Sequence, residues 1–406
     1  MKTKQVLIIG GGVAGLTTAT QLAQLGAVTT VIDKAPFMGG LAITYTCKAT
    51  DHCVKCGACM AAERFGRVVE NERVRLKTSS RVTGCSQEAD GIHVQIETEP
   101  QYIDPDRCTS CGKCVAACPS DAVVQGFSAC HQPFFAIDVT KCQASKGCQA
   151  CQDACPEDAI DPAQKGQIEK WSGDAVVLAT GFTPFDPTGK PYGYHVFPNV
   201  ITTLELEQML RRHQRVIRPS DGAQARSIAF IQCVGSRDIS LNHNWCSKVC
   251  CGSALRMAAK IQNENPEAAV TCFYIDIQTF AKNFDRLYQH TTESVELIRT
   301  IPADIYPADT DNLKVIYTET QPQEPIEALF DLVVLSIGMT PGDGVAEMAG
   351  MLGVDSPKEG FGWPQMPDGF FLAGSVGNPM GIEQAIADAG RATWEAALYL
   401  GLVEVS

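Results

Sequence analysis

The chain has 406 residues, a formal net charge of −13 at pH 7, a hydrophobic share of 45% and a charged share of 19%. The length is enough for two or three cores, so a multidomain or inserted-domain architecture is expected, and the composition excludes a disordered, collagen-like or coiled-coil chain. The acidic balance disfavours nucleic acid and anionic membrane surfaces as partners. No apolar run approaches the roughly eighteen residues that a membrane-spanning helix needs, so membrane insertion is not expected.

The first predicted elements form a βαβ unit. A short apolar strand over Gln5–Ile9 leads into a glycine-rich turn, a helix follows as far as Leu22, and a second strand covers Val28–Ile32. The start of the chain, basic and then apolar, has the outline of a secretory signal. The run Gly10–Gly12 inside its apolar part favours strand, turn and helix instead.

The turn of this unit carries a dinucleotide-binding pattern, G-x-G-x-x-G, formed by Gly10, Gly12 and Gly15. Such a triplet is weak evidence alone, and an ordinary glycine-rich turn is the alternative. Here it follows a strand, opens a helix and precedes an acidic residue, Asp33, about twenty positions later. We therefore expect the helix N-terminus to face a pyrophosphate and Asp33 to hold a ribose.

A first group of cysteines follows this unit with the spacing C-x5-C-x2-C-x2-C. We number the cysteine sets by how diagnostic their spacing is, not by chain order. This set is the third, after the two ferredoxin sets described below. It predicts a [4Fe–4S] site, with zinc or free thiols as alternatives. Its members are Cys47, Cys53, Cys56 and Cys59.

Between positions 102 and 162 the composition changes to cysteine, proline and small polar residues, which indicates a small metal-held insert. The first set matches the bacterial ferredoxin spacing C-x2-C-x2-C-x3-C-P, and the second repeats it with a longer first gap. The first set is Cys108, Cys111, Cys114 and Cys118, and the second is Cys142, Cys148, Cys151 and Cys155.

Two [4Fe–4S] clusters are expected in this insert, each taking its fourth ligand from the other motif. Cys155 would then join Cys108, Cys111 and Cys114, and Cys118 would join Cys142, Cys148 and Cys151. Tetrahedral zinc is the alternative, which the doubled motif and its two prolines disfavour.

Further apolar runs predict the remaining sheet strands. The runs Asp174–Ala179 and Leu332–Ile337 each close at a glycine turn and are expected in one parallel sheet with the first unit. A second α/β unit is expected from a strand over Ile228–Gln232, a helix over Ser253–Asn263 and a strand over Val270–Ile275. A final helix is expected over Gly381–Leu400.

The strand end Ala179–Gly181 and the Gly374 segment, together with the glycine loop, resemble the two-dinucleotide-fold flavoproteins, which include thioredoxin reductase. The resemblance implies FAD in the first fold. One departure is Gly374-Ser375, where those flavoproteins usually have Gly-Asp. The implied FAD-binding residues are Gly10, Gly12, Ala14, Gly15, Asp33, Lys34, Gly40, Leu41, Thr180, Gly181, Gly374, Ser375 and Gln384.

A fourth set of cysteines does not look like a generic cluster motif. It comprises Cys233, Cys246, Cys250 and Cys251. With the glycine loop and the ferredoxin insert, this spacing resembles the unusual [4Fe–4S] site of the flavin-bearing, A-type subunits of heterodisulfide reductase. Members also have a Gly-Gly pair after the first acidic strand, here Gly39-Gly40, a cysteine-rich stretch, and an extended segment, here Pro133–Asp138. The resemblance is to a compact form, without an extra N-terminal cluster domain or C-terminal ferredoxin domain.

This resemblance implies a cytoplasmic oxidoreductase subunit that passes electrons between one FAD and four [4Fe–4S] clusters. The expected partners are other redox subunits of a heterodisulfide-reductase-like complex, either of the B and C types or hydrogenase-linked. A ferredoxin partner, homodimerisation and flavin-based bifurcation stay open. Cysteines at metal-ligand spacings in a long chain also favour a reducing compartment over a disulfide scaffold.

The expected fold class is α/β, a thioredoxin-reductase-like two-dinucleotide-fold flavoprotein with an inserted two-cluster ferredoxin domain. The FAD-binding domain is expected over 1–101, 163–225 and 330–406, the ferredoxin insert over 102–162, and a second nucleotide fold with its own [4Fe–4S] site over 226–329.

Two rival functions remain at this point. The first is an NAD(P)H-dependent flavoprotein of the glutamate synthase small-subunit type, which the absence of a second glycine loop after Ile228–Gln232 disfavours. The second is a cluster-carrying scaffold without catalysis, which would not need a flavin fingerprint.

Arg256 is the candidate catalytic residue, because members resembling bifurcating subunits carry lysine there, near the flavin N5. A guanidinium stays charged, so it would stabilise an anionic flavin without shuttling a proton. An exposed arginine on a surface helix is the alternative. Cys85, Cys130 and Cys272 are expected as buried small hydrophobes, and His243 as a surface residue.

Overall fold

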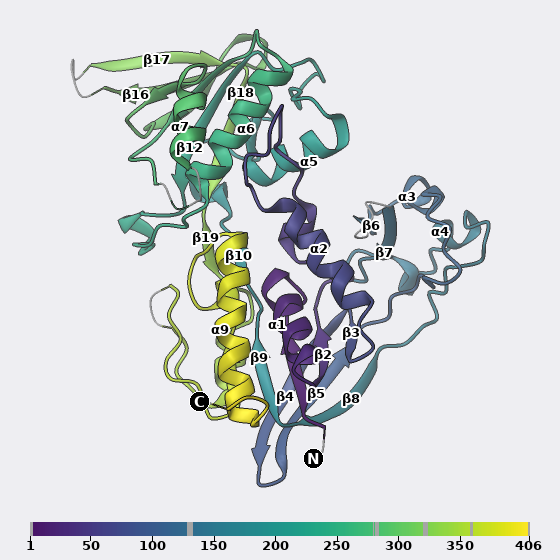
Figure 1. The fold of residues 1–406 in the computed structure, drawn as a ribbon. Helices are drawn as coiled ribbons and strands as arrows, with labels where there is room; N and C mark the ends of the chain where they lie inside the picture. The colour runs from purple at the N-terminus through teal and green to yellow at the C-terminus, as the bar shows by residue number, and fades with distance from the viewer. Residues whose placement is uncertain are drawn as a thin grey trace.

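The computed structural model describes residues 3–127, 133–278, 280, 284–319, 324–357 and 360–404. Within them the chain forms two nucleotide-fold units and a small module that projects beside the first unit (Figure 1). Cys130 lies outside the described residues, so its expected burial stays a prediction. In the described ranges, no helix combines the length and apolar character that a membrane crossing requires.

The first unit is built on a five-stranded parallel sheet in the order β20-β9-β1-β2-β3. The helices that cover one face are packed together, with α1 against both α2 and α9. The strands are β1 (Gln5–Ile9), β2 (Val28–Ile32), β3 (Val74–Lys77), β9 (Ala175–Leu178) and β20 (Phe370–Leu372), and the helices are α1 (Val13–Gln24), α2 (Ala58–Val69) and α9 (Ile382–Leu400).

Alternation along β1 explains how both faces of this sheet are filled. Val6 and Ile8 pack towards α1 and α9, whereas Leu7 and Ile9 pack towards a three-stranded antiparallel sheet. That second layer consists of β4 (Ser80–Glu88), β5 (Gly91–Thr98) and β8 (Gln167–Gly173). The unit is therefore a three-layer structure with its core on both sides of β1.

The ferredoxin-like module is inserted between β5 and β8, which pair directly with each other. An antiparallel bridge between Ile103 and Ile160 closes the module at its base. A Cβ at Gly126 would lie 2.7 Å from the ring of Phe37, so the module packs closely on the turn after β2. Its elements are α3 (Lys113–Ala117), β6 (Val123–Phe127), β7 (Pro133–Ile137), η2 (Ala144–Lys146) and α4 (Ala150–Asp153).

The second unit has its own five-stranded parallel sheet, in the order β11-β18-β12-β13-β14. An antiparallel sheet, β15-β16-β17, covers one face, and helices cover the other. The strands are β11 (Val200–Thr202), β12 (Ser227–Val234), β13 (Ala269–Phe273), β14 (Glu296–Ile298), β15 (Asp304–Pro307), β16 (Leu313–Thr318), β17 (Pro325–Phe330) and β18 (Leu332–Ile337), and the helices are α5 (Thr203–His213), α6 (Cys250–Glu264) and α7 (Phe284–Thr292).

The two units are connected through an antiparallel ribbon of β10 (Phe182–Pro184) and β19 (Met339–Pro341). Helix α8 (Val345–Leu352) follows the ribbon and packs near β4. The short 3-10 helices are η1 (Leu41–Thr44), η3 (Pro187–Gly189), η4 (Ile239–Leu241), η5 (Asp309–Asp311) and η6 (Gly374–Val376).

The prediction that Leu332–Ile337 lies in the first sheet is wrong. This strand, β18, lies between β11 and β12 in the second sheet, where Leu332 to Leu335 are buried. Strand β11 also belongs to the second sheet, so the expected ranges 163–225 and 330–406 each contain strands of both units. A fully buried apolar strand has the same sequence pattern in either sheet, because the pattern does not show which strands lie beside it.

Candidate functional site

The glycine loop lies between β1 and α1 and permits close backbone packing. A Cβ at Gly15 would lie 1.9 Å from the carbonyl oxygen of Gly10. Gly12 is the N-cap of α1 and supplies no side-chain cap, so N–H groups of the first turn remain for an anion. A Cβ at Gly12 would meet only the Cα of Gly40, at 4.0 Å. The loop therefore fits a pyrophosphate beside Gly12.

Asp33 follows β2 and organises this loop. Its carboxylate accepts hydrogen bonds from the N–H groups of Gly11, at 2.6 Å, and Ala35, at 2.8 Å. Burial raises the pKa of Asp33, against the lowering effect of these two hydrogen bonds and of the Lys34 charge. The geometry gives Asp33 a role in holding the loop, and its expected contact with a ribose stays a prediction.

The Gly374-Ser375 turn lies at the N-terminal end of α1. A Cβ at Gly374 would lie 2.5 Å from the Cβ of Ala14, which shows how closely the turn approaches the helix. The N–H of Gly374 donates to the carboxylate of Asp388 on α9 at 2.8 Å, and Ser375 is buried in η6. Asp388 was not predicted from the sequence, because its spacing from Arg391 is typical of an ordinary surface ion pair on a helix.

The other expected FAD-binding residues have the following positions. Gly40 approaches Gly12, and Leu41 begins η1. Thr180 and Gly181 follow β9, and Gln384 accepts a hydrogen bond from the N–H of Gly381 at 3.2 Å. Lys34 is exposed and pairs with Asp343 at 3.7 Å. The structure thus gathers Gly10, Gly12, Ala14, Gly15, Asp33, Gly40, Thr180, Gly374 and Ser375 around the start of α1.

Two cavities in the inserted module are each lined by four cysteines drawn from both ferredoxin motifs. In each case three cysteines come from one motif and the fourth from the other. One cavity is lined by Cys108, Cys111, Cys114 and Cys155, and the other by Cys118, Cys142, Cys148 and Cys151. These groupings match the expected crossed pairing, and four thiolates around one cavity suit a cubane cluster.

The two fourth cysteines have matching surroundings. The N–H of Ala122 donates to the sulfur of Cys118 at 3.3 Å, and the N–H of Ala159 donates to the sulfur of Cys155 at the same distance. Asp121, with φ 49°, and Asp158, with φ 45°, occupy the same left-handed conformation before these donors. The module therefore contains the same local structure twice. In each copy a backbone N–H stabilises the negative charge on the thiolate, of Cys118 in one and of Cys155 in the other.

The fourth set lies at the carboxyl end of β12, the edge at which parallel sheets bind nucleotides. Cys233 is near the end of β12, and Cys250 and Cys251 begin α6. Burial, and then the neighbouring Cys251, raises the pKa of Cys233 to about 12. Burial, and then Cys233, also raises the pKa of Cys250. Crowded buried thiols of this kind ionise readily only with a cation between them, which fits a metal site.

The third set repeats the local backbone of the first ferredoxin motif. Lys55, before Cys56, has φ 53°, and Ser110, before Cys111, has φ 57°. Gly57 has φ 77° and ψ −6° and caps α2, as Gly112 has φ 73° and ψ 2° and caps α3. Both helices carry a cysteine in their first turn, Cys59 and Cys114.

Arg256 does not have the exposed position of a surface helix residue. Its side chain is buried, and the residue is only 8% exposed. The guanidinium donates from Nε to the carbonyl oxygen of Val54 at 2.9 Å and from Nη2 to that of Lys55 at 3.4 Å. The surface alternative is therefore wrong. The expected catalytic role at the flavin stays a prediction, and the observed contacts are with the loop of the third set.

A second anchor of this loop was not predicted. Lys48, next to Cys47, forms an ion pair with Glu207 on α5, and the two side chains are 4% and 5% exposed. Glu207 also accepts from the N–H of Thr46 at 3.1 Å, and Arg211 donates to the carbonyl oxygen of Ile43 at 2.8 Å. The partners lie about 160 positions apart in the chain, so no local pattern could have indicated them.

The cysteines outside the sets and His243 differ in position. Cys272 is buried, as expected, and accepts a hydrogen bond from Gln232 at 3.3 Å, whereas Cys85 is only partly buried. His243 is intermediate in exposure, and its ring contacts Phe185 and Trp245. Its Nδ1 lies 2.9 Å from the carbonyl oxygen of Gly235.

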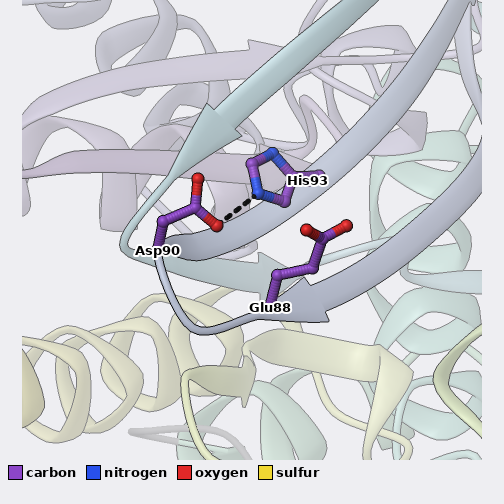
Figure 2. Close-up of side chains that lie close together, drawn as sticks. All are labelled: Glu88, Asp90 and His93. Carbon is purple, nitrogen blue, oxygen red and sulfur yellow. Dashed lines mark hydrogen bonds and ion pairs between the residues drawn. The ribbon is translucent and has the colours of Figure 1, made fainter.

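One further group of possible metal ligands lies on the β4–β5 hairpin. Ligand atoms of Glu88, Asp90 and His93 lie within 4.8 Å of one another (Figure 2). Glu88 and Asp90 are exposed, and His93 contacts Asp90 at 3.0 Å and Ser172 at 2.8 Å. No second feature in the described residues indicates a ligand at this hairpin, so we assign it no binding role.

Comparison with known proteins agrees with this geometry. Residues 8–66 match the NAD(P)-binding Rossmann-like domain family, and residues 102–124 match the 4Fe-4S binding domain family. The chain is 33% identical to the second A-type iron-sulfur subunit of CoB–CoM heterodisulfide reductase from Methanopyrus kandleri, over 100% of this chain and 65% of that protein. It is 34% identical to the A-type iron-sulfur subunit of CoB–CoM heterodisulfide reductase from Methanocaldococcus jannaschii, over 95% of this chain and 63% of that protein.

The chain is similar to A-type subunits of heterodisulfide reductases. It spans less than two thirds of the length of these relatives. Its fold is that of thioredoxin reductase. The enzyme of T. acidophilum matches with a TM-score of 0.55 at 14% identity, over 100% of both chains. The enzyme of Lactococcus lactis matches with a TM-score of 0.54 at 15% identity, over 99% of this chain and 100% of that one. The similarity to these subunits, the two matching domain families and the fold together support FAD and [4Fe–4S] clusters as cofactors.

Proposed function

We propose that the chain is the flavin-bearing oxidoreductase subunit of a heterodisulfide-reductase-like complex and passes electrons between FAD and [4Fe–4S] clusters. The observation that carries this proposal is the pair of cavities in the inserted module, each lined by four cysteines from both ferredoxin motifs. A module of this kind beside a glycine-loop fold suits electron transfer rather than hydrolysis or group transfer.

FAD exchanges one or two electrons and each cluster one, so the two kinds of cofactor together join a two-electron couple to one-electron carriers. The chain's own residues then have three tasks. The glycine loop and Asp33 hold the dinucleotide, the largely buried fourth set excludes water from the edge of the second sheet, and the inserted module presents metal sites towards partners. The second rival, a cluster scaffold without catalysis, leaves the glycine loop without a use.

Direct reaction with NAD(P)H is the alternative that the second unit disfavours. A nicotinamide site there would need a glycine loop between β12 and the following helix. Instead Cys233 lies near the end of β12, and α6 begins with Cys250 and Cys251. We propose that the cluster of the fourth set lies where a second dinucleotide would bind, and that electrons enter and leave through metal.

The third set completes the proposed cofactor content. We propose that it holds a fourth [4Fe–4S] cluster, with Cys53, Cys56 and Cys59 on one loop and Cys47 as the more distant ligand. The matching conformations of Lys55 with Ser110 and of Gly57 with Gly112 support this assignment over zinc or free thiols. Hence all four sets carry clusters in this proposal.

The partners and the domain division are likewise proposals. The named relatives are A subunits of CoB–CoM heterodisulfide reductases, which supports the presence of partner subunits. We propose that these partners are of the B and C types or hydrogenase-linked, and that the chain is cytoplasmic. Ferredoxin as a donor or acceptor, homodimerisation and bifurcation stay open. We propose that the second nucleotide fold begins at β11 and ends at β18, with the FAD-binding domain on either side of it.

The test is cofactor analysis of the chain produced without oxygen. We expect one FAD and about sixteen iron atoms per chain, from four clusters of four irons. Dithionite or a reduced ferredoxin should bleach the flavin, and NADH and NADPH should not. Zinc in place of iron would refute the proposal, and rapid bleaching by either nucleotide would favour the NAD(P)H-dependent rival. About twelve irons would remove the third set from the assignment.

A further inference from the structure

The loop of the third set belongs to the first unit by sequence but is held by the second. In Figure 1 the purple segment that leads into α2 rises beside α5 and α6. Lys48 pairs there with Glu207 on α5, and Val54 packs against Leu255 and other apolar residues around α6 and α7. The metal ligands of this loop are thus fixed by contacts that cross between the two units.

Arg256 makes its contacts at the strained point of the loop. Lys55 has φ 53°, a conformation that is unfavourable for a residue with a Cβ and persists only where the surroundings stabilise it. The guanidinium binds the carbonyl oxygens of Val54 and Lys55, which belong to the two peptide groups on either side of the Lys55 Cα. These two carbonyls lie between Cys53 and Cys56, so the hydrogen bonds fix the segment that separates two proposed ligands.

We infer that Arg256 is a positioning residue of the third cysteine set, whose guanidinium holds the left-handed turn at Lys55 and so orients Cys53 and Cys56 towards one metal site. The inference rests on the proposed function, in which this set carries a cluster. It gives Arg256 a different role from contact with the flavin.

The chemistry of the side chain suits this role. A planar guanidinium reaches two carbonyl oxygens with a fixed fork of donors, which a single ammonium does not reproduce. The guanidinium also lies close to Cys56, Glu383 and Cys53. Gly252 leaves room for the side chain to lie along α6, because a Cβ there would lie 2.7 Å from Nη1 of Arg256.

A further consequence is that one helix serves two metal sites. Cys250 and Cys251 of the fourth set form the start of α6, and Arg256 follows Cys251 by five positions, a rise of about 7.5 Å along the helix. The third and fourth sets are therefore positioned by the same rigid element, which keeps the geometry between their clusters constant.

The test compares Arg256→Met with the wild-type chain, both produced without oxygen. We expect Arg256→Met to retain FAD and to lose about four of about sixteen irons, the content of one cluster. We also expect endoproteinase Lys-C to cut after Lys55, which is exposed, about tenfold faster in the variant, because the turn is no longer held. Cys53→Ala serves as the reference for loss of the third cluster.

The matched control is Lys260→Gln, which removes a positive charge from the same helix. Among the described residues, Lys260 forms its ion pair within α6, with Glu264 at 2.5 Å, so its loss should leave iron content and cleavage after Lys55 unchanged. Arg256→Lys keeps the charge without the fork and should give intermediate values for both. FAD and about twelve irons retained in Arg256→Met would show that the variant is folded.

Wild-type iron content and wild-type cleavage in Arg256→Met would overturn the inference, as would a shifted flavin potential as its only change. The assignment of a cluster to the third set fails separately, if the wild-type chain itself has about twelve irons. In that case the cleavage assay still decides whether Arg256 holds the turn.

Discussion

The N–H of Gly374 donates a 2.8 Å hydrogen bond to the carboxylate of Asp388, in the second turn of α9. This bond fixes the Gly374-Ser375 turn against Ala14 at the N-terminal end of α1. Two-dinucleotide-fold flavoproteins usually have aspartate after this glycine, and here the residue is Ser375. The carboxylate that contacts the turn is that of Asp388, which comes from α9. Asp388 thus holds in place a turn that borders the glycine loop.

Asp388→Ala should weaken FAD binding about tenfold, because a turn that loses a charged hydrogen-bond acceptor no longer packs against α1 in one position. The measurement is the dissociation constant for FAD from flavin fluorescence. Glu395→Ala is the matched control, since Glu395 also pairs with Arg391, at 2.6 Å, but does not contact Gly374. Equal weakening by the two variants would assign the effect to the Arg391 ion pairs instead.

Gly12→Ala should abolish FAD binding without unfolding the protein. The added methyl group meets no protein atom nearer than 4.0 Å, but it occupies the space expected for the pyrophosphate. We expect FAD content to fall at least tenfold, with iron content unchanged. Gly66→Ala on α2, where a Cβ would meet nothing within 4 Å, is the control and should retain FAD. Retention of FAD by Gly12→Ala would place the cofactor elsewhere.

Crossed cluster ligation predicts a specific pattern in double variants. Cys118 and Cys142 line the same cavity, so Cys118→Ala and Cys142→Ala, each alone and both together, should lose about four irons. Cys118→Ala with Cys111→Ala affects both cavities and should lose about eight. Iron analysis after anaerobic purification decides the matter. If the first pair loses eight irons and the second loses four, each motif binds its own cluster.

Glu207→Gln should lower the free energy of unfolding by about 3–5 kcal/mol, because it leaves the Lys48 ammonium buried without a partner charge. Replacing both residues with methionine should cost less than this single change. Urea unfolding of the anaerobic protein measures both. The exposed pair of Lys314 and Glu327, at 2.8 Å, is the comparison, and Lys314→Met should cost about 0–1 kcal/mol. A cost as small for Glu207→Gln would contradict the role of the buried pair.

The β4–β5 hairpin offers a pH-dependent contact. The hydrogen bond to Asp90 raises the pKa of His93 above its ordinary value of 6.5, and the charge of Glu88 adds to this effect. A raised pKa means that the contact stabilises the folded state below pH 6.5 and that this contribution is lost as pH rises through the folded-state pKa. Asp90→Asn should lower the pKa of His93 in an NMR titration, and Glu88→Gln should lower it less. Larger effects of Glu88→Gln would reverse the assignment.

The first βαβ unit was predictable because its signals are local. Strands Gln5–Ile9 and Val28–Ile32 and the start of α1 depend on hydrophobic period and glycine spacing over about thirty residues. The cysteine groupings of the insert were predictable for the same reason, because each ferredoxin motif lies within a short continuous segment of the sequence.

Sheet membership and the surroundings of Arg256 depend on contacts that no local pattern records. Val334 of β18 pairs with Ile201 of β11 and Phe230 of β12, far apart in the chain. A buried apolar strand fits the middle of either parallel sheet equally well. In the same way Arg256 meets a carbonyl 202 positions away, and its amphipathic helix resembles any other in sequence.

The pairing of β5 with β8 bears on how such a chain is assembled from parts. Thr98 lies opposite Gln167, so the chain enters and leaves the metal-binding module at adjacent positions of one antiparallel pair. A short turn at that point would convert β5 and β8 into an ordinary hairpin and leave the flavin fold intact. The entropic cost of closing a loop grows slowly with its length, so an insert of this size between β5 and β8 destabilises the host sheet only slightly. The host strands β5 and β8 therefore hold each other independently of the module, so its removal should not require the rebuilding of the domain that carries it.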